Sequence, residues 1–279
     1  MRKVITSLVL MLIMICAAGT VGAKAWDGKE TQFKEKKVYY IDLDGNKRSE
    51  GVAVQFEYAG KDSKEIKSIL VTIDGKELKI NSKSGLYSGE INATQAPTIE
   101  VVDINPDDSY KELLITIYNQ DKTQLFSDYY AVRYVDKTPQ LLFTTDWVID
   151  VCASDKQKSG DEVICKTKTN CVLDNIQVYR KLKIGKDKTL VDITSQTCSV
   201  SKSPEFYTAR SIKLYEEAST DKSVGSIPAK ATFKVKKVKI KKGVTTFAYV
   251  TYTKGDKEGE GWIDVRPNDS TIFHVVEVK

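Results

Sequence analysis

The sequence predicts an all-β protein, with a β-rich N-terminal domain built as a sandwich or as partial propeller-like sheets, and a small barrel after it. Three observations favour this fold class. Apolar and polar residues alternate along many short segments, turn-forming residues recur about every ten positions, and helical periodicity is hard to find beyond a turn or two. This combination is typical of sandwiches, barrels and propeller-like sheets.

The expected strands are short and regularly spaced. Residues 52–58 alternate between apolar and more polar side chains, and residues 68–73 form the next expected strand. Asp74-Gly75 follows directly and is a strong hairpin-turn dipeptide. The other expected strands share this pattern and cover residues 78–80, 113–118, 129–135, 140–143, 163–167, 176–184 and 232–238.

Residues 1–23 have the three parts of a secretory signal: a basic start, an apolar run over residues 4–18 and small residues up to Ala23. We expect cleavage before Lys24 and a secreted or cell-surface protein. No later segment has the roughly eighteen apolar residues that a transmembrane helix needs. Cys16 leaves a lipid anchor open, although large residues precede it where such anchors need small ones. An uncleaved N-terminal anchor is the other alternative.

The charge of the chain argues against nucleic acid as a partner. The chain carries 43 Lys and Arg residues and 38 Asp and Glu residues, a net charge of +5, and the two signs are interspersed. Nucleic-acid-binding proteins usually concentrate basic residues on one face. Residues 234–242 are the local exception, with lysines set among apolar residues. They form either a solvated lysine edge that resists aggregation or a patch for an anionic wall polymer.

Four cysteines follow the signal: Cys152, Cys165, Cys171 and Cys198. An even number in an exported chain favours two disulfides, and we pair Cys152 with Cys165 across a hairpin and Cys171 with Cys198. Free thiols are the alternative. The absence of a Cys-x-x-Cys pair argues against structural zinc, as does the presence of a single histidine, His274.

The sequence also argues against an enzyme. A Ser/His/Asp or Cys/His arrangement would have to use His274, which lies in a short apolar stretch near the end of the chain and has the character of a structural or exposed strand residue. No Gly-rich phosphate loop and no serine nucleophile elbow occurs. Carboxylates are plentiful, but their abundance alone does not identify a hydrolase.

Two acidic loops repeat 61 positions apart, each before a strand with the same apolar spacing. The candidate cation ligands are Asp42, Asp44, Asn46 and Glu50 in the first loop and Asp103, Asn105 and Asp107 in the second. Oxygen atoms at alternate positions of a tight loop can point at one hard cation, so we expect a Ca²⁺ site in the first loop. The second is poorer, with Lys111 where the closing acid would lie. The alternative is that both are solvated turns.

The first loop resembles the calcium-loop repeats (Asp-x-Asp-Gly-Asp-Gly-x-x-Asp/Glu) of extracellular blade-type repeat proteins. The resemblance covers about fifteen residues per copy. It departs from the pattern at Lys47, where the second glycine usually stands. The resemblance implies an extracellular protein with bound calcium.

A polar stretch at residues 199–204 marks a domain boundary. We therefore divide the chain into a signal at 1–23, a β-rich domain at 24–203 and a barrel at 204–279. Within the last segment, Val224-Gly225-Ser226-Ile227, a strand at 232–238 and a closing Gly261-Trp262-Ile263 follow one another. This order resembles the bacterial SH3-like module of cell-wall and secreted proteins, and we expect Trp262 to pack over Leu214, Val224 and Ile227.

The resemblance implies binding to peptidoglycan, to another wall polymer or to a protein or peptide, without catalysis. The sequence thus predicts an exported bacterial binding protein that is not an enzyme. One alternative is an accessory or inhibitory subunit that docks onto a secreted enzyme. The other is a cell-wall hydrolase with an unrecognised carboxylate site.

Overall fold

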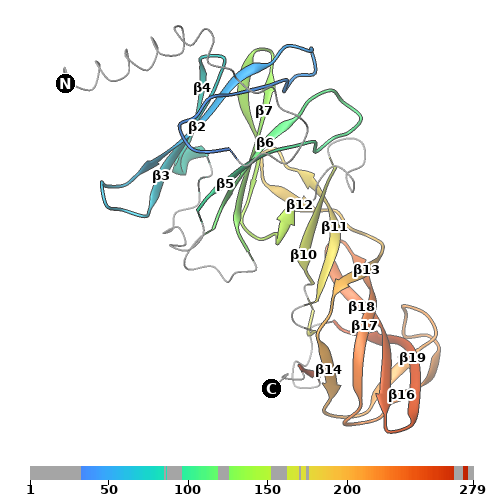
Figure 1. The fold of residues 1–279 in the computed structure, drawn as a ribbon. Helices are drawn as coiled ribbons and strands as arrows, with labels where there is room; N and C mark the ends of the chain where they lie inside the picture. Colours follow the sequence, from blue (N-terminus) through green and yellow to red (C-terminus); the bar gives the residue numbers. More distant parts are fainter. Residues whose placement is uncertain are drawn as a thin grey trace. The chain divides into compact units, whose positions relative to one another are not determined.

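The computed structural model describes residues 33–84, 86, 96–118, 126–151, 162–169, 171–173, 176–266 and 273–275 (Figure 1). The expected signal and Cys152 lie outside these residues. The described residues form twenty β-strands and a single short 3₁₀ helix, Ser82–Ser84, so the all-β prediction is confirmed. Within this part of the chain, no helix is long and apolar enough to cross a lipid bilayer.

The chain divides into two compact units, residues 1–146 and 147–279. The sequence places the boundary after Ser203 instead. In the structure that position separates two strands, β13 (Thr197–Lys202) and β14 (Glu205–Thr208), that both pair with the same neighbour, β17 (Thr232–Lys241). A polar stretch therefore marked a connection inside one unit rather than the end of a domain.

The N-terminal unit consists of two four-stranded antiparallel sheets with the same up-and-down order. The first sheet contains β1 (Tyr39–Ile41), β2 (Glu50–Tyr58), β3 (Ile66–Ile73) and β4 (Lys76–Ile80). The second contains β5 (Thr98–Val102), β6 (Glu112–Ile117), β7 (Asp128–Val135) and β8 (Thr138–Thr145). The repeated acidic loops thus connect the first two strands of each sheet.

The two sheets share one apolar core, which makes this unit a sandwich. Val52 and Val54 of β2 and Ile115 and Tyr130 of the second sheet are almost fully buried in the same cluster. Each sheet ends in a two-residue hairpin with positive φ at both turn residues, as a type I′ turn requires. The turns are Asp74-Gly75 (φ 47° and 75°) and Asp136-Lys137 (φ 51° and 58°).

The strands of the C-terminal unit form one hydrogen-bonded sheet system, and its hub is a ten-residue strand, β17. The strands are β9 (Asp150–Val151), β10 (Glu162–Lys168), β11 (Gln177–Ile184), β12 (Leu190–Asp192), β13 (Thr197–Lys202), β14 (Glu205–Thr208), β15 (Ile212–Tyr215), β16 (Ser223–Ile227), β17 (Thr232–Lys241), β18 (Val244–Lys254), β19 (Lys257–Asp264) and β20 (Phe273–Val275). One edge of β17 pairs with β18. Its other edge pairs first with β14 and then with β13.

The strands β17, β18 and β19 run as a meander, with β14 beside its first strand and β15 beside its last. Because β14 and β15 follow each other in the chain, the sheet has to curve around the residues between them. The concave side holds an apolar core that includes Phe206, Leu214, Phe233, Val250 and Ile263. The other side of the meander faces away from this core.

Candidate functional sites

The first acidic loop, residues 42–50, gathers three carboxylates. Asp42, Asp44 and Glu50 each offer one oxygen atom, and these atoms lie within 4.8 Å of one another. The loop is held by its own backbone: the Lys47 N–H donates to Asp42 Oδ2 at 2.9 Å, and the Leu43 N–H donates to Glu50 Oε2 at 2.7 Å. The three acids therefore converge because the turn is folded tightly around them.

Asn46, the fourth expected ligand of this loop, is used differently. Its side-chain NH₂ donates to Asp44 Oδ2 at 2.8 Å, and its Oδ1 accepts the Arg48 N–H at 2.8 Å. These are the local bonds of an Asx turn. Asn46 thus orients Asp44 and shapes the loop, and it does not belong to the carboxylate cluster.

The electrostatics of the first loop favour a cation. Glu50 is only 3% exposed, and burial raises its pKa, with further increases from Asp44, Asp74 and Asp42. Asp42 Oδ1 is buried and has no hydrogen-bond partner. A buried acceptor without a donor is costly. Hard oxygen ligands suit Ca²⁺, so these three residues fit such an ion chemically.

The second acidic loop, residues 103–112, repeats this design with a built-in positive charge. The Ile104 N–H donates to Glu112 Oε2 at 2.9 Å, just as the Leu43 N–H does to Glu50. Arg133 on β7 then donates from Nε to Glu112 Oε1 at 2.6 Å and from Nη1 to Asp108 Oδ2 at 3.0 Å. A guanidinium therefore neutralises the acids of the second loop.

The carboxylates that come together in the second loop differ from those expected from the sequence. Lys111 was expected at the closing position, but one additional residue brings Glu112 there. Asp107 is exposed, and the carboxylate that meets the arginine is that of Asp108. Asn105 holds Asp108 through a 3.0 Å hydrogen bond. The sequence signal for this arrangement is the arginine on a strand of mostly apolar residues.

Asp103 completes the parallel between the two loops. Like Asp42 in the first loop, it has a buried Oδ1 without a hydrogen-bond partner, and burial raises the pKa of Asp103. Burial also raises the pKa of Glu112, from 4.5 to about 7, while Arg133 and the Ile104 N–H act in the opposite direction. Both loops therefore hold carboxylates that are poorly solvated.

The two acidic loops touch each other. The Lys111 N–H donates to the Leu43 carbonyl at 2.8 Å, and Ser109 Oγ donates to the Asp44 carbonyl at 3.1 Å. Gly45 has φ +74°, and an added Cβ there would lie 2.4 Å from that of Ser109. A glycine is thus required at this crossing both for its backbone conformation and for space.

The expected Cys171–Cys198 disulfide is not formed. Cys198 is a free thiol, buried in β13, and burial raises its pKa. Cys171 Sγ lies 3.6 Å from both Thr169 Oγ1 and the Leu173 carbonyl. Cys165 was expected to pair with Cys152, which lies outside the described residues.

The lysine run at residues 234–242 lies on β17, in the middle of the sheet, except for Lys242 in the turn that follows. It is therefore not the exposed sheet edge that one sequence interpretation required. Lys234 and Lys237 are exposed on the side of β17 that faces away from the core, while Val235 and Val238 are buried on the other. An irregularity between Val235 and Lys237 keeps both lysines on this outer face.

An aromatic row crosses the same outer face. Tyr215 of β15 is paired with Trp262 of β19, and Trp262 with Tyr249 of β18. The Trp262 and Tyr249 rings lie 5.3 Å apart at 68°, an edge-to-face contact, and both side chains are half-buried. The expected packing of Trp262 over Leu214, Val224 and Ile227 is therefore wrong.

The alternation of side chains between the two faces of β19 explains why Trp262 does not face the core. Gly261 and Ile263 point to the core, so the residue between them must point away from it. Gly261 lies close to Leu214, since an added Cβ there would lie 3.2 Å from a Leu214 methyl carbon. Val224 is 53% exposed and is not part of the core.

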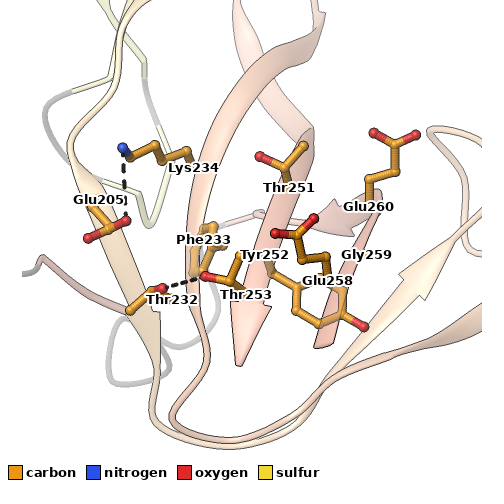
Figure 2. Close-up of a pocket in the computed structure, with 10 residues that line it drawn as sticks. All are labelled: Glu205, Thr232, Phe233, Lys234, Thr251, Tyr252, Thr253, Glu258, Gly259 and Glu260. Atoms are coloured by element: carbon orange, nitrogen blue, oxygen red, sulfur yellow. Dashed lines mark hydrogen bonds and ion pairs between the residues drawn. The ribbon is translucent and has the colours of Figure 1, made fainter. Parts of the chain in front are cut away.

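Beside the aromatic row lies an open pocket of about 470 Å³ (Figure 2). Figure 2 shows Lys234 and Glu205 on one side, Glu258 and Glu260 on the other, and the threonines of the strands between them. The lining residues are Glu205, Thr232, Phe233, Lys234, Thr251, Tyr252, Thr253, Glu258, Gly259 and Glu260. Apart from Phe233 and Gly259, they all carry a hydroxyl group or a charge.

The pocket is joined to the aromatic row through Tyr249. Burial raises the pKa of Tyr249, and the Glu260 carboxylate raises it further, so the tyrosine lies close to this wall residue. On the opposite wall, Lys234 Nζ lies 3.9 Å from Glu205 Oε1. The hydroxyls of Thr232 and Thr253 lie 3.1 Å apart on the floor. The face therefore combines rings, hydroxyls and carboxylates.

His274 lies in β20, paired with Tyr207 of β14.

Comparison with protein-family models, with curated proteins and with solved structures finds no match to this chain.

Proposed function

We propose that the protein is an exported, non-catalytic binding protein that attaches to peptidoglycan or another polymer of the bacterial cell wall through its C-terminal unit. The observation that carries this proposal is the outer face of β17, β18 and β19. It exposes an aromatic row beside a ligand-sized pocket of hydroxyl and charged groups. A concave site with rings and a few oriented polar groups is typical of ligand recognition.

Two features support the view that this part of the chain is an SH3-like module. The β17–β18–β19 meander is flanked by consecutive strands, β14 and β15, which is compatible with a small barrel. Gly261 and Ile263 pack inward at the closing strand. The secretory pattern of residues 1–23 supports export and a secreted or cell-surface location.

We also propose that the first acidic loop binds Ca²⁺ through Asp42, Asp44 and Glu50. The buried Oδ1 of Asp42 and the negative surroundings of Glu50 support this proposal, because a hard cation would satisfy both. Its affinity is expected to be on the order of 10⁻⁴ to 10⁻³ M, as in extracellular modules. The ion would stiffen the loop and the edge of the sandwich. The second loop has Arg133 in place of such an ion.

Co-sedimentation with purified peptidoglycan tests the proposed function. The mature chain, starting at Lys24, is expected in the pellet at low salt, with no release of reducing or amino groups. Release of such groups would identify the hydrolase. Mass spectrometry of the protein from the culture medium should find Lys24 at the N-terminus, and recovery of intact Met1 would contradict cleavage.

A second candidate function is docking onto a secreted enzyme as an accessory or inhibitory subunit. The observation that favours it is β16, which ends the sheet path and pairs only with β15 among the described strands. Its residues are exposed except for Ile227. An exposed strand edge can pair with a strand of another protein. A chain that stays in the supernatant with peptidoglycan would favour this function.

A further inference from the structure

The outer face of the C-terminal sheet is ordered into cross-strand rows, with one residue from each of β17, β18 and β19. From the aromatic end, the rows are Lys237–Tyr249–Trp262, Lys234–Thr251–Glu260 and Thr232–Thr253–Glu258. Rows of one face repeat every second residue, about 7 Å along a strand. A ligand longer than one ring can therefore touch the aromatic row and the pocket together.

We propose that this face is a carbohydrate site that takes a neutral or amine-bearing sugar chain and excludes an acidic one. The inference rests on the proposed wall-binding function and names the ligand class of the same face. Trp262 and Tyr249 supply an apolar platform, and the pocket supplies the polar groups that fix the sugar.

The platform suits the C–H face of a sugar ring. Trp262 and Tyr249 are both half-buried, so each keeps part of its ring open to solvent while packing against the other. Rings held in this way lose little side-chain freedom when a ligand packs on them.

The pocket suits hydroxyl groups. The Thr232, Thr251 and Thr253 side chains both donate and accept hydrogen bonds, and the Glu258 and Glu260 carboxylates only accept them. Sugar hydroxyls can match both kinds of group. None of these side chains has to move far, because all lie on strands of one sheet.

The charges of the pocket select against acidic sugars. Three carboxylates line it, those of Glu205, Glu258 and Glu260, against the single ammonium of Lys234. Lys234 already lies beside Glu205, at 3.9 Å, so the opposite wall keeps its negative charge. A ligand carboxylate would meet like charge there, whereas an amine would be attracted. Lys237 lies outside the pocket, across Tyr249 from Trp262.

The test uses three soluble hexamers with the mature full-length chain and isothermal titration calorimetry. Chitohexaose is neutral, its deacetylated form carries amines, and hexagalacturonate carries carboxylates. We expect the amine form to bind more tightly than the neutral one, and the acidic hexamer to bind at least tenfold more weakly than the neutral one. Trp262→Ala should weaken binding of the first two about tenfold, which is the contribution of one aromatic contact.

Glu260→Gln is the variant that isolates charge, because it keeps the shape and the acceptor oxygen. It should remove the preference for amines while chitohexaose still binds. Lys241→Ala, at the far end of β17, is the matched control and should bind all three as the wild type does. Both substitutions are on exposed side chains, so the fold is retained.

Several results would overturn the inference. Hexagalacturonate binding as tightly as the amine form would refute the charge selection. Unchanged affinity in both Trp262→Ala and Glu260→Gln would place the sugar elsewhere, and if those variants still sediment with walls, the proposed function stands without this site. Conversely, a wild-type chain that binds the soluble hexamers but not peptidoglycan would retain the site and refute wall attachment.

Discussion

Arg133→Met is expected to destabilise the N-terminal unit more at high pH than at low pH. Glu112 is fully buried with its pKa raised from 4.5 to about 7, so protonation favours the folded state. At about 1.4 kcal/mol per pKa unit, the unfolding free energy of the wild type falls by about 3 kcal/mol as the pH rises from 4.5 to 7. In the variant, which lacks the guanidinium, the pKa of Glu112 is higher still, so the unfolding free energy continues to fall above pH 7.

The size of that additional loss follows from the contacts of the arginine. At pH 8 the wild type has ionised Glu112, whereas the variant, without the guanidinium, keeps this buried carboxyl protonated. At about 1.4 kcal/mol per pH unit above a pKa of about 7, the variant loses about 1.4 kcal/mol more at pH 8 than it loses at pH 5. At pH 5 the Glu112 carboxyl is protonated, so only the packing of the arginine and its ion pair with Asp108 are lost. Together, the lost packing and the lost ion pair should lower the free energy of unfolding by about 1 kcal/mol.

Urea unfolding with pulsed hydrogen–deuterium exchange measures this effect unit by unit. Peptides from β6 and β7 report on the N-terminal unit, and peptides from β17 and β18 give an internal reference that should not change. Glu112→Gln is the matched control, because in that background Arg133→Met should cost the same at pH 5 and pH 8. Equal losses at the two pH values in the single variant would refute the reasoning.

Three other predictions test the remaining features. Millimolar calcium should raise the melting temperature of the wild type by mass action, and Asp44→Ala should abolish the rise; identical melting in calcium and chelator would mean that the loop is only a turn. Trp262→Ala should cost about 1 kcal/mol and Ile263→Ala about 2–5 kcal/mol, because only the second is fully buried; urea titration showing the reverse order would contradict the assignment of faces. Gly45→Ala should lower the melting temperature more than Gly75→Ala, since both have φ near +75° but only the first Cβ collides with a neighbour, and equal losses would exclude the collision as the cause.

Local patterns in the sequence were sufficient to locate many of the strands and a turn. Alternating burial along β2 and the tight turn at Asp74-Gly75 both agree with the expectation, because each depends on neighbours in the chain. The pairing of β13 with β17 depends on residues far apart in sequence, and no local signal records it. The polar residues 199–204 therefore predict a domain boundary, although residues 199–202 belong to β13.

The sites were predictable to a similar extent. The spacing within one loop was enough to predict that the carboxylates of Asp42, Asp44 and Glu50 lie close together. The aromatic row could not be found in this way, because Tyr215, Tyr249 and Trp262 become neighbours only through the registers of three strands. The sequence-based expectation placed Trp262 on the core face of β19, which separates it from Tyr215 and Tyr249 on the outer face.

The position of β17 also determines when the edges of β13 and β14 and the Cys198 thiol become covered as the C-terminal unit is synthesised. β13 and β14 are made before β17, yet one edge of each is covered only once Thr232–Lys241 has been added. Until then, bare strand edges invite aggregation, and the Cys198 thiol of β13 lacks the strand that shields it in the finished protein. A chain interrupted between residues 209 and 231 would therefore be open to oxidation at that thiol, which completion of the sheet prevents.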